Sequence, residues 1–347
     1  MGTARPSYIF AVIMAALAIF FGISAITSTY AADRKSIRWA TSSTGSYGYK
    51  VAAQMINLLE NALDGEYTIT VNPYQSSTAS VKALMDGQSE IGYTSDVTIT
   101  QIYKGEGSFK NYNPAKSRVV HTWYAYPLET FMAVYAPKAS QYKCWGDFSG
   151  KPVFFTPAGF GTWLNFQRIY KALGYNFNHV QISEASQGDA LQAGTIAGAV
   201  AYTTSGRSLP SYWRETELRS DIKIINPSPD EVERLTVAGL APVKIDPQQV
   251  FSKDVGVKTI LGVPSLYGYH ARADMPEEVV YKMLSKFHDA REALAKADPG
   301  FIPMARYFVV MQVQGINGNP TIPVHPGLAK FLKEKKAWNE KWTIAGK

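Results

Sequence analysis

The sequence predicts an α/β protein built as a clamp of two similar lobes with a ligand cleft between them. Short β-like runs alternate with amphipathic helical stretches, which predicts mainly parallel sheet covered by helices. Each half also begins with a strand, a Gly-rich turn and a helix, WATSSTGSYGYK in one half and FFTPAGFGTWL in the other. Of the 347 residues, the 316 that follow Ala31 are enough for two lobes of ordinary size.

The order of the predicted elements supports this division. In the first half we expect strands at 37–42, 67–71 and 90–94 and helices at 49–63, 76–85 and 96–103. Pro127 is expected to separate two further strands, 119–126 and 130–136. In the second half we expect strands at 152–156, 180–183, 197–203 and 222–225 and helices at 162–173, 187–193, 210–219 and 230–238.

The last part of the chain is predicted to return to the first lobe. Strands within 258–272 come first, and helices at 276–296, 301–313 and 326–341 follow. The predicted lobes are therefore residues 32–130 with 250–347, and residues 131–249. A cleft between two such lobes collects the loops at the carboxyl ends of the strands, where α/β sheets bind ligands.

Residues 1–31 have the pattern of an export signal. Arg5 precedes an apolar run of 19 residues at 8–26, and Thr29 and Ala31 form a small-x-small cleavage site. The run is also long enough to span a bilayer, so an uncleaved anchor is the alternative interpretation. Both interpretations place the rest of the chain outside the cytoplasm, in the periplasm.

Composition and motifs exclude several classes of function. The Lys and Arg residues behind the net charge of +7 are scattered, and no basic stripe for nucleic acid is present. The one cysteine, Cys144, rules out an internal disulfide, and no two of the five histidines share metal-ligand spacing. Neither a G-x-S-x-G elbow nor a phosphate loop occurs. We therefore expect a monomer without metal, cofactor or catalytic activity.

Small hydroxyl residues and glycine recur at four predicted strand-to-helix turns, at 41–47, 76–80, 94–96 and 157–162. A helix N-terminus offers unpaired N–H groups and a partial positive charge, which suit a carboxylate or another oxyanion. Ser, Thr and Asp are also ordinary helix caps, so each turn alone has a purely structural interpretation. Four such turns on one side of two lobes predict a shared pocket for a small organic anion or amino acid.

Aromatic side chains stand near the same turns, among them Tyr47, Tyr126, Phe160 and Trp163. Rings beside Gly-rich turns are candidates for a cleft wall that buries the apolar part of a ligand, and core packing is the alternative.

Three further polar residues are candidates at the second lobe and the crossing between lobes. Arg207 follows the strand that ends at Thr203, and we expect it either to pair with a ligand carboxylate or to lie on the surface. Glu129 is expected to fix a hinge or to face a ligand ammonium group.

Six segments in order resemble the TAXI-type solute receptors, the binding proteins of one branch of TRAP transporters. They are ATSSTGSYGYK, SSTASVKALMDGQSEIGYTSDVTITQIYKG, WYAYPLETFMAVYA, FSGKPVFFTPAGFGTW, RADMPEEVVYKMLSKF and IPVHPGLAKFLKEK. The similarity covers about residues 37–335. It implies a type II-like periplasmic-binding-protein clamp that delivers a glutamate-like amino acid or a dicarboxylate to a membrane permease of the TRAP type.

Carried over by position, the resemblance also implies a set of ligand-binding residues. The positions are Thr44, Gly45, Ser46, Tyr47, Ser77, Ser80, Ser95, Asp96, Gly161 and Thr162. The chain departs from the family at Phe160, where a Ser is usual, and Trp163 follows closely. A ring in place of a hydroxyl favours a ligand with an apolar or aromatic part over glutamate itself.

Three other functions remain open from the sequence. A binding protein of an ABC transporter would have the same lobes and another permease. An exported enzyme on the same scaffold would need an acid–base pair in the cleft, and a partner of a membrane receptor kinase would be revealed by a pull-down.

Overall fold

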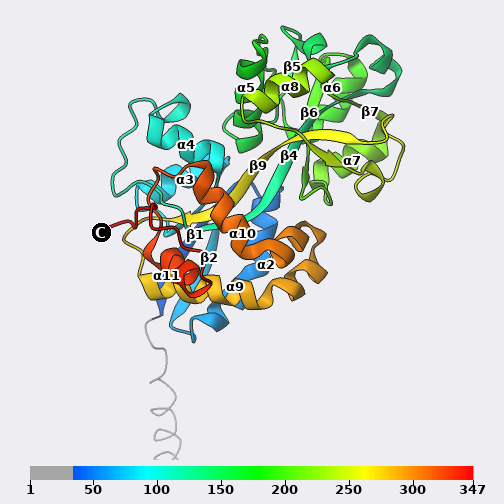
Figure 1. Cartoon of the computed structure of the whole chain (residues 1–347). Coiled ribbons are helices and arrows are strands. Elements are labelled where there is room, and N and C mark those ends of the chain that lie inside the picture. The colour runs from blue at the N-terminus through cyan, green and yellow to red at the C-terminus, as the bar shows by residue number, and fades with distance from the viewer. Residues whose placement is uncertain (1–33, 347) are drawn as a thin grey trace, which may run out of the picture.

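Two lobes joined by two long strands make up the computed structural model, which describes residues 34–346 (Figure 1). The connecting strands are β4 (Trp123–Tyr135) and β9 (Ile260–Ala271). The predicted export signal, residues 1–31, lies outside the described residues. Within residues 34–346, no helix combines the length and the apolar character needed to cross a membrane.

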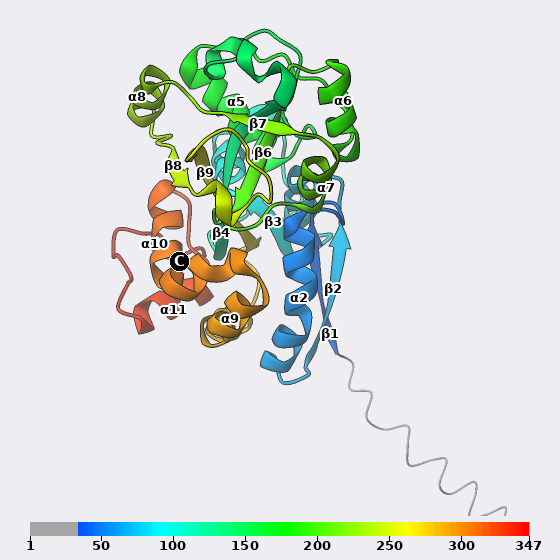
Figure 2. The same ribbon diagram turned by 90° about the vertical axis from the view of Figure 1, so that its right-hand side faces the viewer.

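Lobe 1 is built from the N-terminal and the C-terminal segments of the described chain. Its elements are β1 (Lys35–Thr41), α2 (Tyr47–Ala62), β2 (Tyr67–Pro73), α3 (Ser77–Met85), β3 (Ile91–Ser95), α4 (Asp96–Lys104), α9 (Glu277–Ala297), α10 (Ile302–Gly318) and α11 (Pro326–Glu334). Figure 2 shows α10 and α11 on the side of the lobe away from β1 and β2. In its core, Trp123 of β4 stacks on Phe287 of α9 with ring centroids 3.9 Å apart.

Lobe 2 contains the middle of the chain. Its elements are β5 (Val153–Phe154), α5 (Gly161–Leu173), α6 (Gln187–Ala193), β6 (Gly198–Thr204), α7 (Ser211–Arg219), β7 (Ile222–Ile225), α8 (Pro229–Val237) and β8 (Val243–Ile245). Its core includes Phe155, which stacks on Phe177 at 4.0 Å and meets Tyr170 edge-on. We propose that the boundary between the lobes lies within β4 and β9. Residue 130 of the expected division lies in β4, whereas residue 250 precedes β9, which begins at Ile260.

The strands form one path of hydrogen-bonded neighbours in the order β2-β1-β3-β9-β4-β6-β5, with β7 paired to β4 and β8 paired to β9. The prediction of mainly parallel sheet is correct for β1–β2, β1–β3 and β5–β6. It is wrong for the centre, where β9 runs antiparallel to β3, β4 and β8, and β4 runs antiparallel to β6 and β7. The crossing strands therefore make the sheet mixed.

Pro127 does not break β4, contrary to the prediction of two strands. The Pro127 carbonyl accepts a hydrogen bond from the Ser205 N–H, so the nitrogen and the carbonyl of Pro127 face the side of the strand on which β6 lies. Pairing of β4 with β6 begins at Leu128 and Thr204, just where β6 ends. A proline is tolerated there because no carbonyl of β6 needs its missing N–H.

Two other expected elements differ from the structure. Residues 180–183 form no strand. The neighbouring strand β5 has only two residues, and its pairing with this segment is limited to an isolated bridge between Val153 and His179. The last helix ends at Glu334 instead of residue 341. Lys336 adopts a left-handed conformation (φ 55°), and the Ala337 N–H bonds back to the Leu332 carbonyl.

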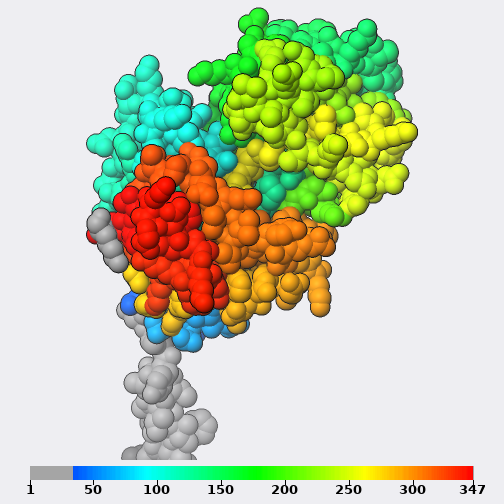
Figure 3. All heavy atoms as spheres, viewed as in Figure 1, coloured from blue at the N-terminus to red at the C-terminus, as the bar shows by residue number. Residues whose placement is uncertain are grey.

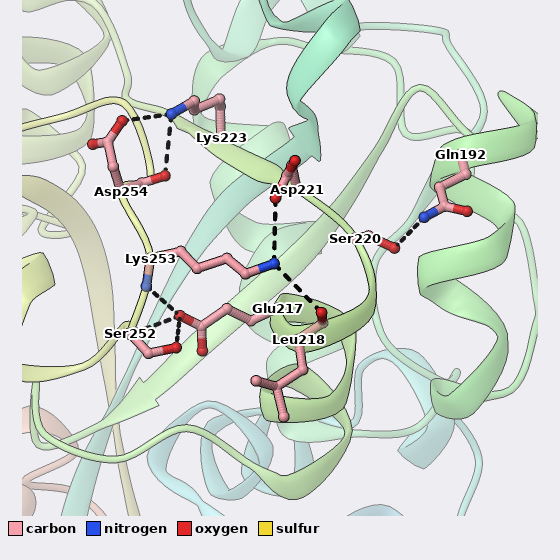
Figure 4. A network of polar contacts seen from close by, with 9 residues as sticks. All are labelled: Gln192, Glu217, Leu218, Ser220, Asp221, Lys223, Ser252, Lys253 and Asp254. Carbon is pink, nitrogen blue, oxygen red and sulfur yellow. Dashed lines mark hydrogen bonds and ion pairs between the residues drawn. The ribbon is translucent and has the colours of Figure 1, made fainter.

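The segment that leads from lobe 2 into β9 is held by buried and exposed polar contacts (Figure 4). The Glu217 carboxylate of α7 accepts hydrogen bonds from the backbone N–H groups of Ser252 and Lys253 and from the Ser252 hydroxyl. Lys223 of β7 pairs with Asp254 at 2.6 Å. These contacts fix the chain just before it crosses to lobe 1.

Candidate ligand-binding site

A cavity lies between the lobes, where the strand-to-helix turns of both meet. Its empty volume is about 270 Å³, part of which opens to solvent. Its walls are small hydroxyl residues and aromatic rings, with one Leu and one Gly. They are Ser42, Ser46, Tyr47, Ser77, Tyr93, Leu128, Phe160, Gly161, Thr162, Tyr202 and Tyr267.

The N-termini of α2, α3 and α5 converge on this cavity. Ser46 caps α2 through a hydrogen bond that its Oγ accepts from the Tyr49 N–H, and Ser42 Oγ lies 2.6 Å from Ser46 Oγ. Ser77 is the first residue of α3. Phe160 precedes α5 and offers no side-chain cap. Because each helix start carries about half a positive charge, the three together favour an anionic group in the cavity.

The lobes touch each other on both sides of the cavity. On one side the Thr78 hydroxyl donates to the Gly159 carbonyl at 2.7 Å, and the Gly161 N–H donates to Ser77 Oγ at 3.1 Å. On the other, the Ser205 hydroxyl donates to the Gly300 carbonyl at 2.6 Å. The structure therefore shows the clamp closed.

Replacing Thr78 with valine is expected to weaken ligand binding about fivefold. The substitution keeps the shape of the side chain and removes one hydrogen bond between the lobes, which is worth about 1 kcal/mol. Titration calorimetry measures the affinity, and Thr68→Val, at an exposed position of β2, is the matched control. Equal affinities of the two variants would show that this contact does not contribute to closure.

The aromatic wall supplies buried phenol groups. Tyr93 and Tyr267 lie with ring centroids 5.4 Å apart, and the Tyr126 hydroxyl donates to the Tyr93 hydroxyl at 3.2 Å. The Tyr267 hydroxyl is buried without a hydrogen-bond partner among residues 34–346. Burial raises the pKa of Tyr93 and Tyr267 well above the usual value. These phenols therefore stay neutral and can donate hydrogen bonds to a ligand oxygen.

The structure brings six of the residues proposed from the sequence to the cavity. They are Ser46, Tyr47, Ser77, Phe160, Gly161 and Thr162. Tyr126 lies behind this set and meets Tyr47 edge-on at 4.9 Å. Trp163 points away, toward Phe177 and His179 of lobe 2.

Four other candidates at the turns of lobe 1 have different surroundings. Thr44 and Gly45 are exposed. Ser80 Oγ accepts a hydrogen bond from the Tyr93 N–H and joins α3 to β3. Ser95 caps α4 through the Thr98 N–H.

Asp96 belongs to a different hollow. One of its carboxylate oxygens accepts hydrogen bonds from the N–H groups of Val97 and Leu266. It lines an open hollow between α10 and the strands β4 and β9, at the waist of the molecule in Figure 3. Asp96 therefore does not line the inter-lobe cavity.

The remaining candidates lie on the lobe 2 side. Arg207 is exposed and lies outside the lining of the cavity. Glu129 is buried, and one of its oxygens accepts hydrogen bonds from the Thr203 hydroxyl at 2.6 Å and the Gly206 N–H at 2.9 Å. Glu129 and Thr203 therefore join β4 to the end of β6, where the chain crosses between lobes.

Glu129 is expected to make the stability of the protein depend on pH. Burial raises its pKa from 4.5 to about 7. The folded protein then holds this proton more tightly than the unfolded chain, so the stabilisation is complete below about pH 4.5 and is lost as the pH rises through 7. The free energy of unfolding should therefore fall between about pH 4.5 and pH 7. In Glu129→Gln this fall should be smaller than in the wild type, by up to about 3 kcal/mol. Urea unfolding at several pH values measures this difference.

A second carboxyl titrates in the same pH range and serves as the control. Burial raises the pKa of Glu184 to about 7 as well. Glu184→Gln should flatten the curve over the same pH range, and the effects of the two substitutions should add. A Glu129→Gln curve parallel to the wild-type curve would contradict the prediction.

Five residues of the wall were not singled out from the sequence: Ser42, Tyr93, Leu128, Tyr202 and Tyr267. Ser42 lies within the predicted turn 41–47, and Tyr202 lies within the predicted strand 197–203. Tyr93 is two residues before Ser95. Tyr267 comes from β9, and its alternation with Tyr269 was the available signal that it shares a face of the sheet.

The fold is that of two-lobed periplasmic binding proteins. A family model matches residues 39–335, and the chain belongs to the NMT1-like family. A solved periplasmic transporter has 16% sequence identity over 89% of this chain and 94% of its own, with a TM-score of 0.50.

Two further solved structures are similar. The aliphatic sulphonate binding protein SsuA from Escherichia coli has 16% identity over 86% of this chain and 83% of its own, with a TM-score of 0.46. XAC2383 from Xanthomonas citri, bound to ATP, has 8% identity over 82% of this chain and 96% of its own, with a TM-score of 0.49. No curated protein matches the sequence.

Proposed function

We propose that this protein is an extracytoplasmic solute receptor that binds a small organic anion with an apolar or aromatic part between its lobes. The observation that carries the proposal is the convergence of three helix N-termini on the inter-lobe cavity, which is lined by hydroxyl groups and rings. Helix starts and hydroxyl donors suit an oxyanion, and the rings suit an apolar body. Membership of the NMT1-like family and the two-lobed fold support the same function.

We further propose that the receptor is exported and hands its ligand to a TRAP-type permease without changing it chemically. The six segments similar to TAXI-type receptors support this partner. An ABC transporter is the alternative, because a binding protein of that system would have the same two lobes. Uptake by proteoliposomes that contain either kind of transporter distinguishes the two, because only the ABC system requires ATP.

Thermal unfolding tests ligand binding. The mature protein is unfolded and refolded to remove any bound molecule, and it is then heated with a panel of organic acids. A ligand at 100 times its dissociation constant adds about 2.7 kcal/mol of stability, which raises the melting temperature by a few degrees. A panel without any such shift would contradict the proposal of an organic anion.

A further inference from the structure

The eleven residues that line the inter-lobe cavity include no Lys, Arg, Asp, Glu or His. This composition is unusual for a site that binds an amino acid or a dicarboxylate, because each of those ligands carries a second charge. The question is whether a charged side chain from elsewhere in the described chain reaches the cavity when the lobes close.

Closure adds no charged group, because the lobes already meet in this structure. The contacts of Thr78 with Gly159 and of Gly161 with Ser77 close one side, and the Ser205 contact with Gly300 closes the other. The Tyr267 hydroxyl also lies against Gly161, where an added Cβ would be 2.2 Å from it. The lining is therefore complete as it stands.

Three acidic groups in lobe 1 and at the crossing between the lobes are occupied by other partners. Asp298 accepts a hydrogen bond from Lys50 Nζ at 2.8 Å with one oxygen and from the Gly300 N–H with the other. Glu129 is held by Thr203 and Gly206, and Asp96 by backbone N–H groups. None of the three lines the cavity, so none can pair there with a ligand ammonium group.

The basic groups near the cavity are occupied in the same way. Lys50, in the first turn of α2, pairs with Asp298. The Arg168 guanidinium of α5 donates to the side-chain oxygen of Asn165 and to the Pro264 carbonyl. A second carboxylate on the ligand would thus find no cation, whereas a first one finds the three helix starts.

We propose that the cavity selects singly charged acids, with one oxyanion group at the helix N-termini and an apolar body, and rejects both amino acids and dicarboxylates. The inference rests on the proposed function and defines its ligand class. An ammonium group closed into the cavity would lose its water without gaining a carboxylate, and contact with aromatic faces offsets that loss only in part.

Two matched sets of probes test the charge rule. The first is 3-phenylpropanoate and phenylalanine, which differ by one ammonium group. The second is pentanoate, norvaline and glutarate, which share a five-carbon chain and differ in one ammonium or one carboxylate group. Titration calorimetry on the refolded, ligand-free protein measures the dissociation constants.

We expect at least one singly charged acid to bind at least tenfold more tightly than its amino acid or dicarboxylate counterpart. Equal or tighter binding of the amino acid or of glutarate would overturn the charge rule and leave the proposed function intact. If none of the five probes binds at concentrations up to 10 mM, both the charge rule and the proposed function are overturned. A dissociation constant at that limit corresponds to a binding free energy of about −3 kcal/mol. The three results are therefore distinguishable.

Discussion

Replacing Gly161 with alanine is expected to weaken ligand binding by about tenfold to a hundredfold. A Cβ atom at this position would lie 2.2 Å from the Tyr267 hydroxyl and 2.8 Å from the ring carbon that bears it. Overpacking of this kind costs about 1–3 kcal/mol. Because Gly161 belongs to lobe 2 and Tyr267 pairs with β3 and β4 in lobe 1, the cost arises only when the lobes close.

Small-angle X-ray scattering with and without ligand, together with calorimetry, measures closure and affinity. Gly45 is the matched control, since it lies at the equivalent turn of lobe 1 with no atom within 4 Å of an added Cβ. Gly45→Ala should bind as the wild type does. Adding Tyr267→Phe to Gly161→Ala removes the closest atom and should restore part of the affinity. Wild-type binding by Gly161→Ala would show that the ligand-bound lobes do not approach as closely as they do here.

The sequence allows the turns of the site to be predicted because their chemistry is local. Ser46, Ser77 and Gly161 stand at the first turn of a helix, where hydroxyl and glycine residues follow from the geometry of helix starts. The same local rule also selected Ser80 and Ser95, whose hydroxyls are used within lobe 1. Capping and ligand binding require the same residue types, so composition alone cannot separate them.

The aromatic wall could not be predicted in the same way because it depends on long-range pairing. Tyr267 reaches the cavity since β9 crosses back between β3 and β4, a register that joins residues far apart in the chain. Arg207 was a candidate because it follows a strand end, yet Gly206 turns the chain (φ 62°) and leaves Arg207 exposed. Strand order and turn geometry therefore determine which of these residues line the cavity.

Replacing Ser77 with aspartate is expected to reduce binding of singly charged acids by at least about tenfold without unfolding the protein. Ser77 is the first residue of α3, where a carboxylate stabilises a helix by about 0.3–1 kcal/mol. Its side chain already accepts the Gly161 N–H, and a carboxylate oxygen can accept the same bond. Two negative charges 4 Å apart repel each other by about 4 kcal/mol at an effective dielectric constant of 20, which exceeds the gain at the helix start.

Ser77→Asn separates charge from size, since it has nearly the same shape as Ser77→Asp and no charge. Calorimetry with 3-phenylpropanoate should give a large loss for Ser77→Asp and a smaller one for Ser77→Asn. The neutral amide of the same acid should not distinguish the two variants, because it places no negative charge beside the new carboxylate. If both variants bind the acid equally, the positive helix ends do not hold its charged group, and the polar end of the ligand must lie elsewhere in the cavity.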